Sequence, residues 1–187
     1  MNITRRTLAA AAMALAGVLG PLTLSAAHAD PAAQLTADGL RALHRLEDVR
    51  PRARYFAKHA KAIMVFPSVL KAGFVFGGET GNGVLLQDGK ADGYYNLTGG
   101  TWGLQIGGED FAYVVFFMSD GSLDYLRKSG GFSAGTGPSL VIVNKGAAAE
   151  ADTTTLTHDV YAFPFNEKGL MADLTLQGTK ITRIHMR

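Results

Sequence analysis

One stretch of the sequence, residues 61–86, constrains the fold more than any other. A short apolar run over 62–66 stops at Pro67, a second run over 73–76 opens into four closely spaced glycines, and a third run over 84–86 follows. Because glycine permits positive φ and close approach of neighbouring backbone, this pattern predicts two strands joined by a glycine-rich turn. The stretch has no nucleophile–base pair, no metal-ligand cluster and no Walker lysine. We therefore interpret it as scaffold.

The first 29 residues have the features of an export signal. Two arginines precede a mostly apolar segment over 8–24, and the small residues at 27 and 29 fit a cleavage site before Asp30. We expect residues 1–29 to be a cleaved signal peptide, and residues 30–187 to form a single domain in the periplasm or outside the cell. The chain has no cysteine, which excludes disulfides, thiol chemistry and cysteine-bound zinc.

Basic residues gather in one part of the chain. From residue 41 to residue 71 there are eight basic residues and only two acidic ones, Glu47 and Asp48. The predicted leader holds two of the 18 basic residues and none of the 16 acidic ones, so residues 30–187 have no net charge. Outside the basic stretch, these residues are therefore net acidic. The basic members of the stretch are Arg41, Arg45, Arg50, Arg52, Arg54, Lys58, Lys61 and Lys71.

Two consecutive amphipathic helices are predicted within this basic stretch. Leucines and a valine recur every three residues over 40–49, which predicts a helix that begins at Thr36, with the Thr36 side chain as its N-cap. Pro51 ends it and suits the first turn of a second helix with Tyr55 and Phe56 facing inward. The basic side chains lie beside these apolar faces, either as a solvated surface or as a surface that meets phospholipid headgroups. Composition alone favours the solvated surface.

The remainder of the chain has the pattern of strands and tight turns. Turns are predicted at Asp88-Gly89, Gly99-Gly100 and Gly107-Gly108, and the apolar run over 111–118 predicts a central strand. A short helix near 120–129 is capped by Ser119 or Asp120, and further strands are expected over 140–143, 159–163, 170–176 and 180–185. The sequence predicts an α+β domain: an antiparallel, barrel-like β-sheet of about nine strands, an N-terminal helical pair and one short helix.

Motifs that carry chemistry are weak. Residues 131–135 match G-x-S-x-G, and Ser133 is followed by Asp159 or Asp173 and then His185, the order of a hydrolase triad. A hydrolase requires a helix after this serine, but a glycine, a proline and a strand follow it, which argues against a hydrolase. A serine esterase using Ser133 and His185 is therefore only an alternative. Glycine spacing, histidine spacing and charge likewise give no support to a nucleotide, metal or nucleic-acid site.

Three segments together resemble the SYLF-domain family of lipid-binding proteins, in its exported bacterial branch. They read AKAIMVFPSVLKAGFVFGGETGNGVLL at 60–86, YYNLTGGTWGLQIGGEDFAYVVFFMSDGSLDYLRKS at 94–129 and YAFPFNEKGLMADLTLQGTKITRI at 161–184. The resemblance implies phospholipid binding, with phosphoinositides preferred in eukaryotic relatives and actin bundling in some. We do not carry over phosphoinositides or actin, because an exported bacterial protein ordinarily meets neither.

The resemblance also implies membrane contact through basic residues in the N-terminal part of the domain, which favours the headgroup-binding interpretation of the basic helices. We therefore expect a non-enzymatic protein of the cell envelope, without a cofactor, that binds anionic phospholipids and associates peripherally with membranes. A scaffold whose basic face binds an acidic protein is the other alternative. The lipid-binding residues predicted are Arg41, Arg45, Arg52, Arg54, Lys58, Lys61 and Lys71.

Overall fold

The computed structural model describes residues 30–73, 76–102, 107–129, 131–133, 137–143, 157–166, 169–170 and 178–186. The predicted signal peptide and most of the strand predicted over 170–176 lie outside these residues. The helices are α1 (Pro31–Val49), α2 (Ala53–His59) and α3 (Asp120–Lys128). The strands are β1 (Ala62–Gly73), β2 (Phe76–Gln87), β3 (Lys90–Trp102), β4 (Gly107–Phe117), β5 (Gly131–Ser133), β6 (Leu140–Ile142), β7 (Val160–Asn166), β8 (Gly169–Leu170) and β9 (Thr179–Ile184).

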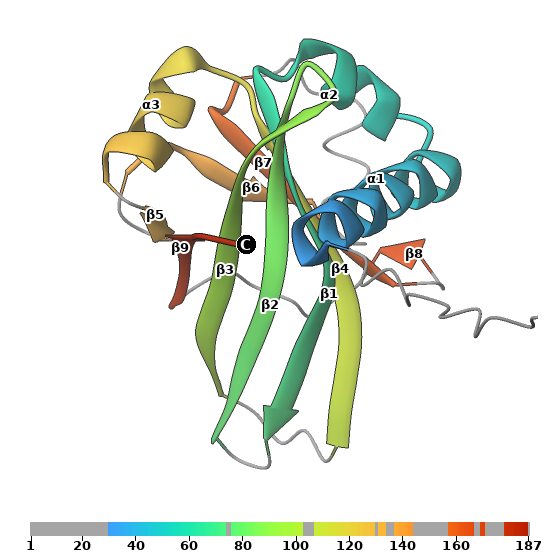
Figure 1. Ribbon diagram of the computed structural model, residues 1–187, viewed down its shortest axis with the longest axis vertical. Coiled ribbons are helices and arrows are strands. Elements are labelled where there is room, and N and C mark those ends of the chain that lie inside the picture. The colour runs from blue at the N-terminus through green and yellow to red at the C-terminus, as the bar shows by residue number, and fades with distance from the viewer. Residues whose placement is uncertain are drawn as a thin grey trace, which may run out of the picture.

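These strands form one curled sheet in the order β5-β9-β3-β2-β1-β4-β7-β6, and β8 pairs with β7 (Figure 1). The α+β class, the strand number, the helical pair and the short third helix are therefore confirmed. The antiparallel prediction is wrong at one place, because β6 pairs with β7 in parallel. The long connection between Ile142 and Val160 has the length that a parallel pairing requires.

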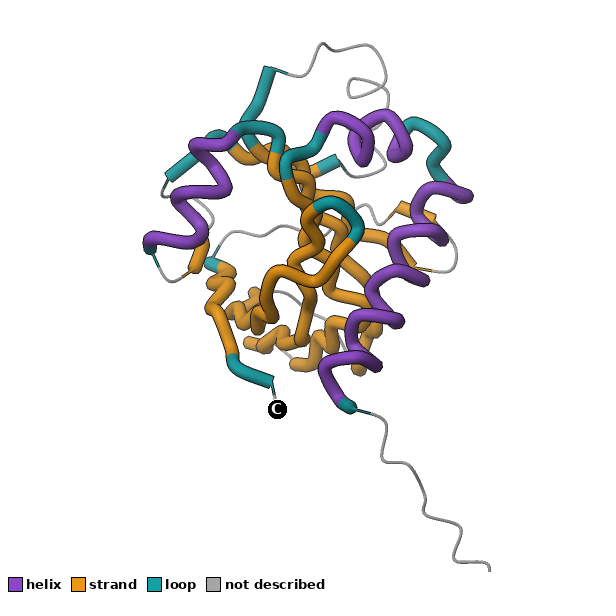
Figure 2. Tube along the Cα trace, turned by 45° about the horizontal axis from the view of Figure 1, so that its top comes forward, coloured by secondary structure: helices purple, strands orange, loops and turns teal. Residues whose placement is uncertain are grey.

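The sheet is covered on both faces, as the helices on either side of the strands in Figure 2 show. On the outer face, Leu46 of α1 and Phe56 of α2 belong to one hydrophobic cluster with Phe116 and Phe163. The inner face packs against α3 and joins side chains from the whole width of the sheet. Phe132 of β5 and Leu140 of β6 belong to this one cluster although their strands end the sheet, so the sheet curls into a half-barrel.

Helix α1 begins earlier than the sequence predicted. Asp30 is its N-cap, and the Asp30 carboxylate accepts a hydrogen bond of 3.0 Å from the backbone N–H of Ala32. The prediction that Thr36 caps the helix is wrong, because its hydroxyl donates to the carbonyl of Ala32 one turn back. The short helix near 120–129 is confirmed with Ser119 as N-cap. The second predicted helix is present as α2, but Pro51 precedes its N-cap residue Arg52 and is not in its first turn. The prediction that Tyr55 faces inward is wrong, because this side chain is exposed.

The scaffold stretch has a different structure from the one predicted. Strand β1 continues through Pro67, where it carries one extra residue relative to both neighbouring strands, and this makes a β-bulge. Proline fits here because it has no N–H to donate to a ladder. The glycines predicted as a turn lie inside β2, and an added Cβ at Gly83 would lie 2.5 Å from the Phe66 ring. Glycine therefore serves close packing against the bulge.

Of the other predicted glycine turns, one is confirmed and two are wrong. Asp88 and Gly89 form the predicted β2–β3 turn, with φ values of 50° and 73°. The turns predicted at Gly99-Gly100 and Gly107-Gly108 are wrong, because these glycines lie in β3 and β4. At Gly99 an added Cβ would lie 2.9 Å from the Glu79 carboxylate, so this glycine makes room for a neighbouring side chain.

We expect Gly83→Ala to destabilise the domain by about 1–3 kcal/mol, because the new methyl group overlaps the Phe66 ring and the Val65 carbonyl. Urea unfolding followed by circular dichroism measures this change. Gly100→Ala is the matched control, since an added Cβ there meets nothing within 4 Å. Equal stability of the two variants would contradict the packing role of Gly83.

Candidate functional site

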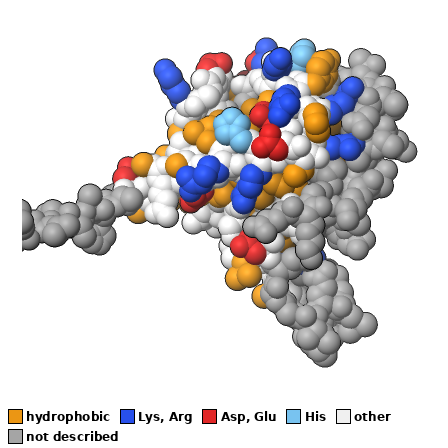
Figure 3. Space-filling view, turned by 90° about the vertical axis from the view of Figure 1, so that its right-hand side faces the viewer, with side chains coloured by type: hydrophobic (Ala, Val, Ile, Leu, Met, Phe, Trp, Pro, Cys, Tyr) orange, Lys and Arg blue, Asp and Glu red, His pale blue; other side chains and the backbone are white. Residues whose placement is uncertain are grey.

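The outer surface of α1 and α2 carries most of the predicted lipid-binding residues. Arg41 and Arg45 on α1, and Arg54 and Lys58 on α2, are exposed. Figure 3 shows lysine and arginine side chains across this face, interleaved with carboxylates, histidines and hydrophobic side chains. Residues 30–61 hold seven Lys and Arg against four Asp and Glu, so the helical region stays net positive.

Carboxylates of the protein itself pair with three of these cations. Arg41 pairs with Asp38, Arg54 Nη2 lies 3.2 Å from Asp48 Oδ1, and Lys61 Nζ lies 3.3 Å from Asp120 Oδ2. Such exposed pairs contribute about 0–1 kcal/mol, so a ligand can replace them at small cost. Within the described part of the chain, Arg45 and Lys58 have no carboxylate at ion-pair distance, and they are the cations most available to a ligand.

Arg52 is half-buried and differs from its neighbours. Its guanidinium carbon lies 5.4 Å from the centre of the Tyr55 ring, within cation–π range. Its Nε is buried and has no hydrogen-bond partner in the described part of the chain. Tyr55 itself is 44% exposed, and Val49 at the end of α1 is 47% exposed, so apolar surface lies next to the cations.

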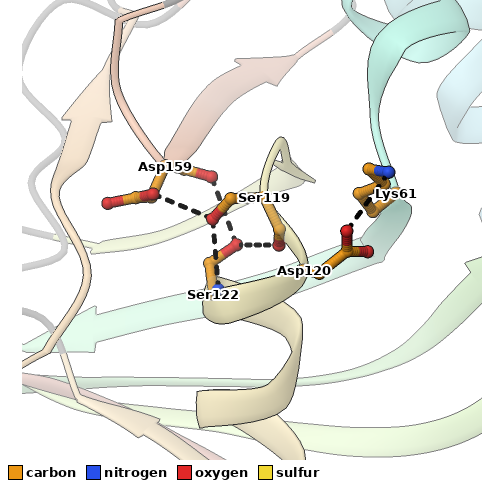
Figure 4. A network of polar contacts seen from close by, with 5 residues as sticks. All are labelled: Lys61, Ser119, Asp120, Ser122 and Asp159. Carbon is orange, nitrogen blue, oxygen red and sulfur yellow. Dashed lines mark hydrogen bonds and ion pairs between the residues drawn. The ribbon is translucent and has the colours of Figure 1, made fainter.

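The structure separates Lys61 and Lys71 from the other predicted cations. Lys61 follows α2 and lies against Asp120 at the start of α3 (Figure 4). Lys71 is buried on the inner face of the sheet, opposite Glu79 of β2. Since only 8% of Lys71 is exposed, it does not belong to the basic surface of the helices.

Lys71 belongs to a polar cluster inside the half-barrel, with Glu79, Thr179 and Tyr113. Glu79 Oε1 accepts a hydrogen bond of 2.8 Å from the Thr179 hydroxyl, while Glu79 Oε2 and the Tyr113 hydroxyl are buried and have no hydrogen-bond partner among the residues that the structure describes. Burial raises the pKa of Glu79, and the Thr179 hydrogen bond and the charge of Lys71 oppose that rise. Burial also raises the pKa of Tyr113, which keeps its hydroxyl neutral.

Sequence reasoning missed this cluster because of the β-bulge. Residues 62, 64 and 66 face inward, and after the extra residue Val69 and Lys71 do so. Without the bulge, Lys71 would share the outward direction of Val65. The proline within an apolar strand was the available signal for this change of face.

Two adjoining hollows flank Arg45 on the outer surface. The larger, about 530 Å³, lies between the end of α1 and strands β4 and β7; the smaller, about 480 Å³, extends along α1. Arg45, Asp48 and Pro67 line both, so we treat them as one feature, the Arg45 groove. Asp110 lines the larger hollow, and its Oδ1 accepts a hydrogen bond of 2.9 Å from the Ser68 hydroxyl in the bulge.

A second polar network is structural. The Asp159 carboxylate accepts hydrogen bonds from the hydroxyls of Ser119 at 2.8 Å and Ser139 at 3.0 Å (Figure 4 shows the first). Ser119 Oγ accepts from the backbone N–H of Ser122 and so caps α3. The hydrogen bonds from Ser119 and Ser139 lower the pKa of Asp159. The network joins the start of β7 to α3 and to the segment before β6.

The residues of the esterase alternative are not brought together where the structure describes them. Ser133 lies at the end of β5 opposite Lys180, and His185 lies beyond the other end of β9. At about 3.3 Å per residue their backbone positions are roughly 16 Å apart. Asp173 lies outside the described residues.

The described residues show neither a metal-ligating cluster nor a membrane-spanning helix. No group of three or more potential metal-ligating side chains occurs among them. None of their helices combines the length and the apolar character needed to cross a bilayer.

Comparison with known proteins gives two matches. The family described as "Ysc84: Las17-binding protein actin regulator" matches residues 98–185. Protein YSC84 of Saccharomyces cerevisiae is 31% identical over 134 residues, which cover 68% of this chain and 28% of the yeast protein. The chain thus spans little more than a quarter of that relative, and the match lies within one part of it.

The inner cluster gives a stability prediction with opposite signs. We expect Tyr113→Phe to leave the free energy of unfolding within about 0.5 kcal/mol of the parent or to raise it, because it removes a buried hydroxyl that has no partner among the described residues. Thr179→Val removes the hydroxyl that donates to Glu79 Oε1 and is expected to cost about 1–3 kcal/mol of unfolding free energy. Urea titrations measure both. A large loss in Tyr113→Phe would show that the hydroxyl has a partner in solution.

The Asp159 network gives a pH prediction. Because its hydrogen bonds favour the ionised carboxylate, the folded-state pKa lies below the ordinary value of 3.8. The network therefore contributes stability above that value and loses it as the pH falls through the folded-state pKa. We expect Asp159→Asn to be less stable than the parent at pH 7, with the difference shrinking below about pH 4. Thermal unfolding over a pH series measures it, and a pH-independent difference would contradict this role.

Proposed function

Because the chain belongs to the Ysc84, or SYLF-domain, family, we propose that it is a non-enzymatic binding module for anionic phospholipid at a membrane surface. The observation that carries the proposal is the exposed basic surface of α1 and α2, with Arg41, Arg45, Arg54 and Lys58. A basic residue near an anionic membrane contributes about 1 kcal/mol of binding free energy. Neither comparison names an enzymatic activity.

Apolar side chains next to the cations support contact with a bilayer rather than with free anions alone. Val49 and Tyr55 are exposed at the junction of α1 and α2, and Tyr55 has the amphipathic ring that favours the interface. The ion pairs of Arg41 and Arg54 are exposed, so lipid phosphates can compete with Asp38 and Asp48. On this proposal the surface exchanges internal carboxylates for phosphates as it docks.

We further propose that the protein acts in the periplasm or outside the cell as a peripheral membrane protein. This proposal rests on the signal-like residues 1–29, with their arginine pair, apolar segment and small residues before Asp30.

A protein partner is the second candidate. The matching family is described as Las17-binding and as an actin regulator, and carried to this chain this description favours a protein ligand. The mixed charges of the helical face also favour it, because cations alternate with Asp38 and Asp48 on one surface. An acidic protein of the cell envelope would fit the net positive charge.

The lipid proposal is tested with vesicles of phosphatidylcholine with and without phosphatidylglycerol, over a salt series. We expect binding only to the anionic vesicles and weaker binding at higher salt. Arg45 and Lys58 are exposed on the helical surface and have no carboxylate partner among the described residues. Replacing both, Arg45→Gln with Lys58→Gln, removes about 2 kcal/mol of binding free energy and weakens binding roughly 30-fold. Flotation and co-sedimentation measure the bound fraction.

The matched control, Lys180→Gln with Arg183→Gln, removes two exposed charges from β9 and is expected to bind like the parent. Equal binding to both kinds of vesicle at every salt concentration would contradict the proposal. Capture of an acidic envelope protein that persists in detergent, together with an absence of vesicle binding, would favour the second candidate.

A further inference from the structure

The Arg45 groove has an unusual combination of charges for a surface that binds anions. Arg45 is a cation without an ion-pair partner in the described residues, yet the carboxylates of Asp48 and Asp110 line the same hollow. A ligand with negative charge alone would meet both carboxylates as well as the arginine. A ligand that carries both signs would satisfy the arginine and a carboxylate together.

The two carboxylates are not equally available. Asp48 already pairs with Arg54 at 3.2 Å. Asp110 is exposed, and the Ser68 hydroxyl holds one of its oxygens at 2.9 Å. Its other oxygen has no hydrogen bond within the described residues. Because the Ser68 hydroxyl fixes one oxygen of Asp110, the other oxygen has a defined orientation. A binding site for a cationic group requires such an orientation.

The size and surroundings of the groove fit the head of an amphiphile. A hollow of about 530 Å³ is in the range of small-molecule sites. Leu70, the cross-strand neighbour of Asp110, is 53% exposed, and Val49 lines the same hollow. Apolar side chains at the rim can contact acyl chains while the charged groups hold the head.

We propose that the groove binds the head group of a phospholipid with a primary ammonium, such as phosphatidylethanolamine: Arg45 binds the phosphate and Asp110 the ammonium. This inference rests on the proposed function, since it identifies the lipid recognised by the same surface. A primary ammonium donates hydrogen bonds to a carboxylate, whereas a quaternary ammonium has no N–H to donate. Recognition of a quaternary group uses open aromatic faces, and the aromatic residues of this hollow, Phe111 and Phe165, are each 2% exposed.

The test compares vesicles with one fixed fraction of phosphatidylglycerol and a remainder of either phosphatidylethanolamine or phosphatidylcholine. We expect the parent protein to bind the ethanolamine vesicles about fivefold more tightly, the effect of one exposed charge pair. Asp110→Asn should remove this advantage and keep binding to phosphatidylglycerol. Asp88→Asn in the β2–β3 turn removes the same charge elsewhere and should keep the advantage.

Equal binding of the parent to both mixtures would overturn the inference, as would an ethanolamine advantage that persists in Asp110→Asn and therefore comes from lipid packing. Soluble phosphoethanolamine, phosphocholine and inorganic phosphate, titrated by NMR, separate the head group from the bilayer. We expect phosphoethanolamine alone to shift signals of residues near both Arg45 and Asp110. Equal shifts with inorganic phosphate would overturn the inference, whereas loss of all vesicle binding with phosphoethanolamine binding intact would refute only the proposed membrane function.

Discussion

The structure depends on strand β1, which lies between β2 and β4 and contributes buried side chains to both faces of the sheet before its bulge. Met64 and Phe66 fill the inner core, while Val65 packs toward the helices, so the one strand anchors two hydrophobic clusters. Its bulge at Pro67 and Ser68 shifts the register against both neighbours at once. Gly81 and Gly83 of β2 absorb the shift, because a side chain at either position would overlap β1. The glycines of β2 therefore allow β1 to carry a bulge and still pack closely against its neighbour.

The same bulge shapes the Arg45 groove and the polar cluster inside the half-barrel. On the outer face, Pro67 lines the Arg45 groove and Ser68 orients Asp110. On the inner face, the extra residue turns Lys71 into the half-barrel toward Glu79. A strand without the bulge would exchange these directions and place the lysine outside. An irregularity in the scaffold thus decides which charges are offered to a ligand and which are enclosed, as bulges near functional sites commonly do.

The sequence predicted best where local chemistry leaves few choices. The three-residue recurrence of leucines predicted the buried face of α1, and Ser119 was a predicted cap of α3. Asp88-Gly89 was predicted as a turn, because these residues accept the positive φ that the turn requires. The sequence-based prediction failed at Gly99 and at Gly83, because the sequence alone does not distinguish a glycine that allows close packing from one that allows a turn. The groove was not predictable, because Arg45, Ser68 and Asp110 come together only through the register of β1 with β4. The inward turn of Lys71 required knowledge of the bulge.

In the helical face, the net charge and the individual fixed charges have different effects: the first contributes to affinity and the second to selectivity. Long-range attraction to an anionic surface depends on net charge, which the pairs of Arg41 with Asp38 and Arg54 with Asp48 leave positive. Screening at physiological salt limits that attraction to about 8 Å, so under the proposed function it would bring the surface to the membrane without selecting a lipid. Choice requires groups held in fixed positions, and the bulge supplies one by fixing Asp110 through Ser68. On this view the carboxylates among the cations do not simply weaken the basic surface, because they allow it to distinguish one head group from another.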